Sequence, residues 1–420
     1  MPPKDDTFRT LADNVLSGIR QYERLVVPTV TDAPIVSLVN QLINEAIESN
    51  ASDIHIEPVN QLIRIRLRID GELSEWHQPL PAQMQAVLIS RIKIMSQLNT
   101  TEHRLPQDGR ISYPYHAHTV DIRVSTMPVM GGEKLVLRLL NGSQQLKAIA
   151  ELDLSTSNET LFRRWSHMPY GLIASCGPVN SGKTTSLYAA LNELNSIHKN
   201  IVTIEDPIEY SLTGVNQIQV NAKMELTFAA GLRSILRQDP DIIMVGEIRD
   251  EETAEIAIRA ALTGRLLFTT LHTGDAVGAI FRLLDMGIMP YLLSASLIGI
   301  VAQRLVRRLC PQCREIYTVE TASPEAVLLG RHFYPGIQLY HACGCDICHH
   351  TGYRGRLAIH ELLPVSDNLR AAILQRSDLP TFRRLTAAMG LTSLLDDGIE
   401  KSIAGLTTIQ EVRRMIYGEF

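Results

Sequence analysis

The chain has 420 residues, more than one hydrophobic core accommodates, so two or three domains are expected. Hydrophobic residues make up 45% of it and charged residues 20%, a balance typical of a soluble globular protein. The net charge of −5 excludes a general attraction to nucleic acid or anionic lipid, so any basic surface must be local.

The longest uncharged stretch, 286–303, comes close to the length of a membrane span. It carries Pro290, two serines, two glycines and Gln303, and we interpret it instead as a helix that begins near Pro290 and is buried between other elements. Residues 1–22 are polar and mixed in charge, so we do not expect them to act as a signal peptide. We therefore expect a cytoplasmic protein that meets a membrane only through a partner.

The first third of the chain predicts a small α/β domain. Residues 1–30 have the character of a loosely held arm and linker, and the domain is expected over 31–145, with its end near Asn141-Gly142. Helical spacing and strict alternation of apolar residues define its elements. The predicted helices are 35–48 and 82–97, and the predicted strands are 54–56, 63–69, 120–124 and 135–139.

After a polar linker, the pattern changes to short apolar strands separated by helical stretches. Such an alternation predicts a parallel sheet with crossover helices. The predicted strands are 172–175, 201–205, 242–246 and 266–270. We expect this core over 146–307, a cysteine-rich module over 308–355 and a helical region over 356–420.

The segment 177–184 matches the pattern GxxxxGK[ST], follows the strand 172–175 and opens into the helical stretch 185–194. In this context, backbone N–H groups and a helix N-terminus converge on phosphate oxygens. Lys183 supplies a charge for the β- and γ-phosphates, and the Thr184 hydroxyl can bind Mg²⁺. A glycine-rich turn without a ligand does not explain Lys and Thr together. The predicted phosphate-binding residues are Gly177, Pro178, Val179, Asn180, Ser181, Gly182, Lys183, Thr184 and Thr185.

Acidic residues and a histidine follow three of the predicted strands, at the edge where open sheets bind ligands. Glu205 is the candidate for polarising the attacking water, although a solvated acidic turn at Glu205-Asp206 is the alternative. Glu247 follows 242–246, where phosphate-loop enzymes hold an acid near Mg²⁺. His272 is the candidate for sensing phosphate, with a structural role as its alternative.

The nucleotide is expected to be ATP, because no [NT]-K-x-D motif for reading guanine occurs in the chain. A small-molecule kinase would share this loop. It would leave the first domain and the cysteine module without a purpose.

Two CxxC pairs, Cys310-x-x-Cys313 and Cys345-x-x-Cys348, predict a structural zinc site, because four thiolates suit tetrahedral Zn²⁺. Cys343, His349 and His350 are alternative ligands, but the spacing favours Cys345 over Cys343. The other interpretation is that these cysteines are reduced and bind no metal. A closed site of four cysteines would hold no catalytic water.

These motifs together resemble the type II secretion and type IV pilus assembly ATPases (the GspE/PilB-like family), over about residues 33–420. The motifs that carry the resemblance are ASDIHIEP at 51–58, RLPQDGR at 104–110, GPVNSGKTT at 177–185, IVTIEDPIEY at 201–210, LRQDPDIIMVGEIRDEETAEIAIRAALTG at 236–264, TTLHT at 269–273, and RLCPQC, GCDIC and TGYRGR in the cysteine module.

The resemblance implies an ATPase with a RecA-like domain preceded by a smaller α/β (PAS-like) domain, a zinc-binding insert and a helical C-terminal tail. It implies a homohexamer that works peripherally at the inner membrane, through a platform protein of a secretion or pilus system and a membrane-docking protein. It also implies that arginines of the first domain reach the nucleotide. Arg110 and Arg123 match this role, with Arg104 as a further candidate, and ion pairs at the domain interface are the alternative.

The chain departs from the family pattern in the phosphate loop, where Val179-Asn180 replace Thr-Gly and Cys176 replaces Thr. Asn tolerates the left-handed conformation that glycine supplies, so the loop is expected to form. Arg265 stands where His is common. The additional N-terminal domain of many members, which docks to membrane partners or binds cyclic dinucleotide, is not expected here.

The basic residues allow a second class of function. Arg64, Arg66 and Arg68 share one face of a strand and resemble a nucleic-acid stripe, but the chain has few aromatic residues for stacking, so a solvated or subunit-facing surface is favoured. A nucleic-acid translocase is thus the alternative to an assembly motor, and a catalytically weak scaffold is a third. The sequence leaves open whether the motor serves a secretion pseudopilus, a type IV pilus or a conjugative pilus.

Overall fold

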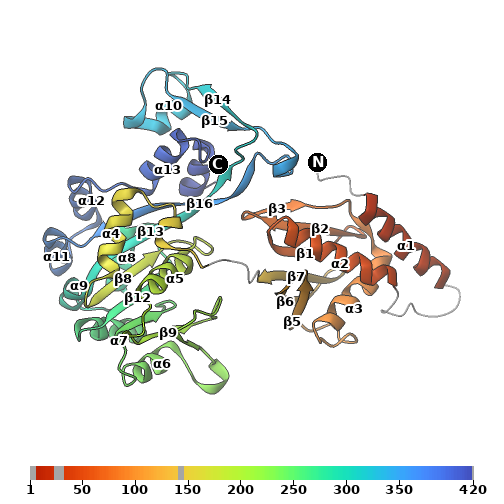
Figure 1. Ribbon diagram of the computed structural model, residues 1–420, viewed down its shortest axis with the longest axis horizontal. Coiled ribbons are helices and arrows are strands. Elements are labelled where there is room, and N and C mark those ends of the chain that lie inside the picture. Colours follow the sequence, from red (N-terminus) through yellow and green to blue (C-terminus); the bar gives the residue numbers. More distant parts are fainter. Residues whose placement is uncertain (1–5, 23–32, 141–145, 419–420) are drawn as a thin grey trace. The chain divides into compact units, whose positions relative to one another are not determined.

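The computed structural model describes residues 6–22, 33–140 and 146–418. The chain divides into two compact units (Figure 1). The first comprises residues 1–145 with the short segment 344–351, and the second comprises 146–343 and 352–420. The predicted domain end near Asn141-Gly142 lies outside the described residues.

The first unit contains one antiparallel sheet whose strands run in the order β3-β2-β1-β7-β6-β5, with β4 paired to β2. Its strands are β1 (Ala51–Val59), β2 (Leu62–Ile69), β3 (Glu72–Glu75), β4 (Leu80–Pro81), β5 (Gln107–Tyr115), β6 (His118–Val129) and β7 (Gly132–Leu140). Its helices are α1 (Asp6–Tyr22), α2 (Ala33–Glu48) and α3 (Gln85–Met95). Buried residues of all three helices and of the strands form one hydrophobic core.

The alternation in β2 separates a buried face from a charged one. Ile63, Ile65 and Leu67 are each at most 1% exposed and belong to the core. Between them, Arg64 and Arg66 pair with Glu57 at 3.2 and 2.8 Å, and a third arginine, Arg68, lies 3.8 Å from Asp53. Burial opposes ionisation of Glu57, but hydrogen bonds from Arg66 and Lys134 lower its pKa to about 2. Because all three arginines face acidic partners, this face is poorly suited to nucleic acid.

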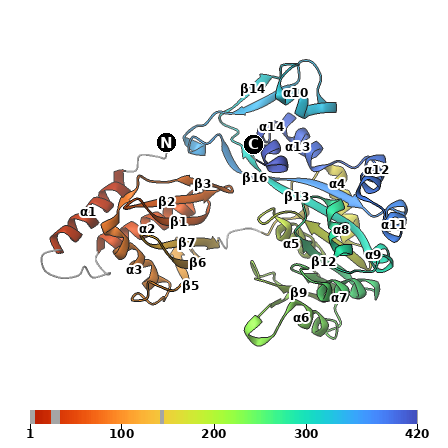
Figure 2. The same cartoon turned by 180° about the vertical axis from the view of Figure 1, so that it is seen from behind.

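The second unit is built on a sheet of order β10-β9-β11-β12-β8-β13-β16, parallel except for β16 (Figures 1 and 2). Its strands are β8 (Gly171–Cys176), β9 (Ile201–Glu205), β10 (Asn216–Gln219), β11 (Ile242–Val245), β12 (Leu266–Leu271), β13 (Leu297–Leu309) and β16 (Tyr353–Pro364). The four strands predicted from sequence, β8, β9, β11 and β12, are confirmed as parallel neighbours.

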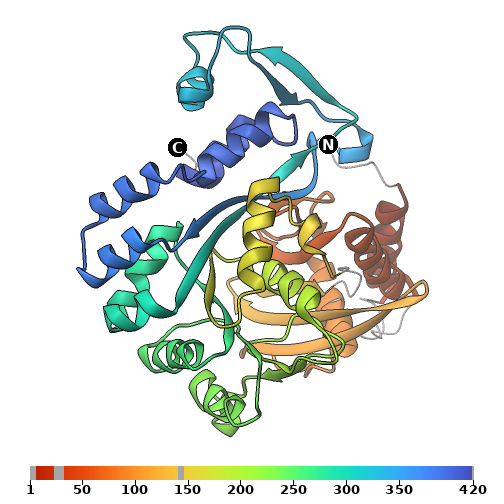
Figure 3. The same ribbon diagram turned by 60° about the vertical axis from the view of Figure 1, so that its left-hand side comes forward.

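Helices cover both faces of this sheet (Figure 3). One core cluster joins the sheet to α4 and α5, and another joins it to α6–α9 and to helices near the C-terminus. The helices are α4 (Thr156–Ser166), α5 (Lys183–Leu194), α6 (Phe228–Ile235), α7 (Glu251–Leu262), α8 (Ala276–Asp285), α9 (Pro290–Ser296), α11 (Asp367–Leu374), α12 (Leu379–Ala388), α13 (Leu394–Ile403) and α14 (Ile409–Tyr417).

The cysteine-rich module carries a small sheet of two antiparallel strands, β14 (Arg314–Thr318) and β15 (Gln338–Ala342), and the short helix α10 (Pro324–Leu329). Short 3-10 helices are found at Ala82–Met84, Ile149–Glu151, Ala222–Met224, Gly330–His332 and Asp346–Cys348.

The prediction of a loose arm at 1–30 is wrong over residues 6–22, which form α1. Phe8, Ala12 and Val15 of this helix are 3–5% exposed and pack into the core of the first unit. Their spacing of three and four residues is the pattern of a helix that buries one face.

Two further expectations are corrected, and one strand was not predicted. The helix predicted from Pro290 does begin there, but it ends at Ser296, and β-branched residues such as Ile300 and Val301 continue as β13. The region 356–420, predicted as helical, begins inside β16. The segment RLPQDGR was not assigned to a strand, although its second half opens β5.

In the described ranges of the chain, no helix combines the length and the apolar character that a membrane span needs.

Candidate nucleotide-binding site

The phosphate-binding loop lies between the carboxyl end of β8 and the first turn of α5. Gly182 caps α5 with a φ of 86°, and Asn180 has a φ of 62°, which is the left-handed region that favours glycine. The expectation that Asn180 adopts the conformation of the glycine it replaces is therefore confirmed. The N-terminus of α5 is thereby aimed into the loop.

Lys183 is 7% exposed, and its ammonium lies inside the loop. It donates hydrogen bonds to the carbonyl oxygens of Gly177 and Pro178 at 2.9 and 2.8 Å. Burial lowers the pKa of Lys183, while the negative charge of Glu247 acts in the opposite direction. A buried ammonium of this kind is a strong site for an anion, because little water competes for it.

Glu247 and His272 meet at the same edge of the sheet, since they follow the neighbouring strands β11 and β12. His272 Nε2 lies 3.2 Å from Glu247 Oε2, and Glu247 also forms an ion pair with Arg249. Glu247 is 8% exposed, whereas the His272 side chain is 48% exposed. The structure thus brings Glu247 and His272 into contact, at the edge of the sheet where the loop that holds Lys183 begins.

Glu205 is not joined to this group by its hydrogen bonds. The residue is 2% exposed, and its carboxylate accepts hydrogen bonds from Thr203 at 2.5 Å, from Gln217 at 3.1 Å and from Tyr188. Burial and the charge of Glu205 raise the pKa of Tyr188. The carboxylate therefore ties α5 to β9 and β10, and its oxygens are already engaged as acceptors.

The predicted arginines lie in the first unit. Arg110 of β5 and Arg123 of β6 face each other in the sheet register. Arg110 is exposed and Arg123 is half-buried. Neither forms an ion pair within the described ranges. The third candidate, Arg104, is 88% exposed at its side chain and lies 3.5 Å from Glu102.

The four predicted cysteines form one cluster, in which the sulfur atoms of Cys310, Cys313, Cys345 and Cys348 all lie within 4.8 Å of one another. Cys345 Sγ lies 3.8 Å from Cys348 Sγ, and none of the four forms a disulfide. A tetrahedral zinc site with Zn–S bonds of about 2.3 Å has sulfur–sulfur edges of about 3.8 Å. The donor set therefore fits Zn²⁺. Cys343 is exposed and lies outside the cluster.

Residues 29–414 match the family model described as "Type II/IV secretion system protein". The chain belongs to this family. It is 49% identical over 384 residues to "Type II secretion system protein E" of Pseudomonas aeruginosa, an alignment that covers 91% of this chain and 76% of that protein. It is 48% identical over 410 residues to "Type II secretion system ATPase E" of Vibrio cholerae, covering 98% of this chain and 80% of the relative.

Among solved structures, this family member is similar to the pilus retraction motor PilT, described with bound ADP. The identity is 26%, the TM-score is 0.59, and the match covers 89% of this chain and 96% of PilT. Together with the phosphate-binding loop, these likenesses make the chain an ATPase, a motor for secretion or pilus assembly.

Two features of this secretion ATPase were not found from sequence. Gln303 of β13 donates to the Ser181 carbonyl and accepts from the Ser186 hydroxyl, although it is more than a hundred positions from either. Arg249 pairs with Glu247. The signal for Arg249 was its place two residues after Glu247, whereas no local pattern pointed to Gln303.

Cys176, which departs from the family pattern, is fully buried, and its thiol lies 3.3 Å from the carbonyl oxygen of Asp275. Burial raises the pKa of this thiol to about 12. Cys176 therefore stays a neutral thiol that packs beneath the loop.

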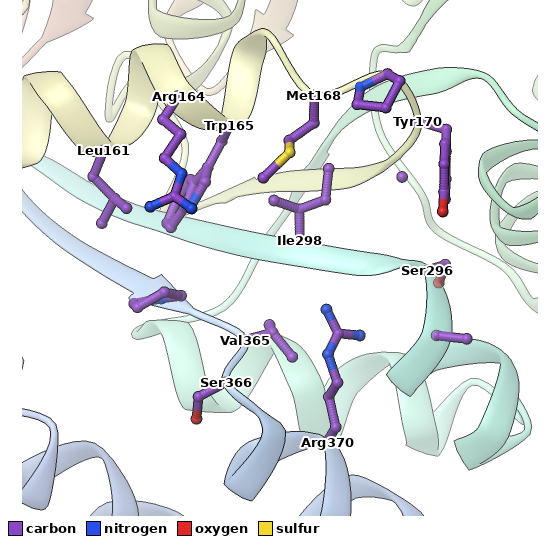
Figure 4. Close-up of a pocket in the computed structure, with 14 residues that line it drawn as sticks. Leu161, Arg164, Trp165, Met168, Tyr170, Ser296, Ile298, Val365, Ser366 and Arg370 are labelled. Atoms are coloured by element: carbon purple, nitrogen blue, oxygen red, sulfur yellow. The ribbon is translucent and has the colours of Figure 1, made fainter.

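A separate hollow of about 450 Å³ opens at the amino end of β8, at the opposite edge of the sheet from the loop (Figure 4). Leu161, Trp165 and Ile298 line it, and Arg164 and Arg370 reach it from α4 and α11. Arg370 is engaged there by the carbonyl oxygens of Ser294 and Leu297. The hollow does not contain any residue of the phosphate-binding loop.

Proposed function

We propose that the chain binds MgATP in the loop 177–185 and hydrolyses it there. In this proposal Lys183 contacts the β- and γ-phosphates, and the Thr184 hydroxyl holds Mg²⁺, which neutralises phosphate charge. His272 contacts the γ-phosphate. The observation that carries the proposal is that the loop with the buried Lys183 and the contacting pair Glu247–His272 follow parallel strands of one sheet, at its carboxyl edge.

We assign the polarisation of the attacking water to Glu247 rather than Glu205. A general base must reach the water with a free acceptor oxygen. The Glu205 carboxylate is 2% exposed and accepts three hydrogen bonds from Tyr188, Thr203 and Gln217. Both oxygens of Glu247 also have partners, but these are the side chains of Arg249 and His272, which are 62% and 48% exposed and can turn to a bound nucleotide. Glu205 then acts indirectly, by holding α5 and its loop on β9.

The second unit is proposed to be a RecA-like core, and the sheet and helices of the first unit a PAS-like domain. Hydrolysis is proposed to move one against the other within a homohexamer. Arg110 and Arg123 have free guanidinium groups among the described residues, and this supports the role of reaching phosphate. Such arginines contribute about 10³–10⁵ in rate where they stabilise transferring phosphate.

We further propose that this motor drives a secretion pseudopilus or a type IV pilus from the cytoplasmic side of the inner membrane. Its partners would be a polytopic platform protein and a membrane-docking protein. The names of the relatives support this assignment. The ion-paired arginines of β2 weigh against the alternative, a nucleic-acid translocase.

The experiment is to measure ATP hydrolysis by the full chain with either the cytoplasmic domain of a platform protein or duplex DNA. Stimulation by the platform domain supports the assembly motor. Stimulation by DNA alone, falling steeply as salt is raised, would instead establish the translocase.

The cysteine cluster is proposed to hold one structural Zn²⁺ that orders the module 308–355. Replacing Cys345 by serine should remove the bound zinc, because three thiolates no longer complete the tetrahedron. Metal binding contributes about 10–16 kcal/mol to ordering modules of this kind. The loss is therefore expected to expose the module to proteases.

The measurement is the zinc content of the purified chain by a colorimetric chelator, with limited proteolysis alongside. Cys343→Ser is the matched control, since Cys343 lies two positions away but outside the cluster. Equal zinc content in Cys345→Ser and the unchanged chain would contradict the assignment of this site.

A further inference from the structure

We propose that Gln303 of β13 is a positioning residue for ATP binding, whose side-chain amide fixes the geometry of the phosphate-binding loop. The inference deepens the proposed function and rests on it, because it concerns how the loop is held for phosphate. Gln303 touches no reacting group; it acts through the loop backbone and the first turn of α5.

The nitrogen and the oxygen of the Gln303 amide form hydrogen bonds on either side of the turn where the loop enters α5. Gln303 Nε2 donates to the Ser181 carbonyl oxygen at 2.7 Å, and Gln303 Oε1 accepts from the Ser186 hydroxyl at 2.8 Å. Ser181 precedes Gly182, which caps α5, and Ser186 lies one turn into that helix. The amide therefore brackets Gly182 and Lys183, the residues that present N–H groups and the ammonium to phosphate.

These hydrogen bonds are buried, so breaking them costs more free energy than breaking exposed ones. Gln303 is 1% exposed, Ser181 3% and Ser186 4%. A buried polar group that loses its partner is costly, because water cannot replace the bond. The amide orientation is also fixed, since exchanging its oxygen and nitrogen would set acceptor against acceptor at the Ser181 carbonyl.

The loop also closes directly on Gln303. A Cβ atom added at Gly177 would lie 2.4 Å from the Gln303 carbonyl oxygen, and one added at Gly182 would lie 3.0 Å from Gln303 Nε2. Both ends of the loop thus rest against this one residue. Glycine is needed here for close approach as well as for its positive φ.

The strands on either side keep Gln303 in place. Ala302 pairs with Cys176, the last residue of β8, so Gln303 lies beside the point where the loop begins. On the other side Gln303 pairs with His360 of β16, which is 1% exposed. The backbone N–H of His360 donates to Asp397 of α13 at 2.8 Å. Gln303 therefore lies on a strand that is paired on both sides.

Replacing Gln303 by methionine keeps the length of the side chain but removes both hydrogen bonds. The Ser181 carbonyl and the Ser186 hydroxyl then lose their buried partner, and the loop is no longer held in one geometry. The affinity for MgATP is expected to fall about tenfold or more. The turnover number at saturating ATP should change by less than about threefold, since Glu247 and His272 are untouched.

The experiment measures the dissociation constant of MgATP, KM and kcat for the full chain and for Gln303→Met, Gln303→Glu, Ser186→Ala and Ser296→Ala. Gln303→Glu keeps an acceptor for Ser186 but places a carboxylate against the Ser181 carbonyl. This variant should therefore bind MgATP more weakly than Ser186→Ala does. Ser296→Ala is the matched control, because its hydroxyl is equally buried but bonds the Leu292 carbonyl at 2.8 Å. Thermal unfolding without nucleotide shows that each variant is folded.

A rise in the dissociation constant and KM of Gln303→Met and Ser186→Ala, with kcat nearly kept and Ser296→Ala unchanged, is the expected result. Should Gln303→Met fail to fold, Ser186→Ala carries the test alone. Unchanged ATP affinity in Ser186→Ala and in the folded Gln303 variants overturns the positioning role, as does a loss confined to kcat. If the unchanged chain itself binds no ATP, the proposed function fails, and this inference fails with it.

Discussion

Replacing Lys183 by alanine should lower kcat/KM for ATP by about a hundredfold to a thousandfold, the effect of removing a preorganised donor at developing charge. Lys183 is 7% exposed and its ammonium is held inside the loop, where low dielectric strengthens its interaction with phosphate. The measurement is phosphate release at several ATP concentrations. KM should rise and kcat should fall, because in the proposed function the charge contacts the β- and γ-phosphates.

Lys199→Ala is the control for the loss of a lysine, since Lys199 is exposed in the same unit. It should hydrolyse ATP at the unchanged rate. If Lys183→Ala also kept full hydrolysis, the loop would not be the catalytic site. If Lys183→Ala lost hydrolysis but still supported assembly of the surface structure in the cell, the scaffold interpretation would replace the motor.

Replacing Glu247 by glutamine should lower kcat by about 10²–10⁴ while MgATP still binds, because the amide keeps the shape but cannot accept a proton. The Glu205→Gln variant separates the two candidate bases. Its amide disturbs the hydrogen bonds to Tyr188 and Thr203, so the expected loss is smaller and accompanied by a lower melting temperature.

Nucleotide binding and single-turnover hydrolysis by both variants give the readout, with Glu252→Gln as an exposed control on α7. Binding without turnover in Glu247→Gln supports the assignment. The opposite pattern, with no hydrolysis by Glu205→Gln and normal hydrolysis by Glu247→Gln, would assign the water-polarising role to Glu205.

The sequence was sufficient to predict the loop and the edge of the sheet that carries the site. The loop residues adopt a geometry that few residue types allow, as the left-handed Asn180 and Gly182 illustrate. Parallel strands place their carboxyl ends together, so residues after β11 and β12 had to meet. The cysteine spacing likewise favoured Cys310, Cys313, Cys345 and Cys348, the four thiols that form the cluster, over Cys343 and the neighbouring histidines.

The remaining features depend on contacts between distant parts of the chain. Glu205 stands at the correct edge, but its side chain turns to Tyr188 and Gln217, and neither partner has a local signal. Gln303 reaches the loop only because β13 pairs with β8. The apolar stretch that contains it can be read as helix or strand, and the partner strand decides between them.

A structure of the Glu247→Gln chain with MgATP tests the proposed site most directly. We expect Lys183 Nζ to leave the carbonyl oxygens of Gly177 and Pro178 and to lie about 3 Å from β- or γ-phosphate oxygens. We also expect His272 and residue 247 to face the γ-phosphate. Nucleotide bound elsewhere, or ATP in the loop with Lys183 still on its own carbonyls, would contradict the proposed site.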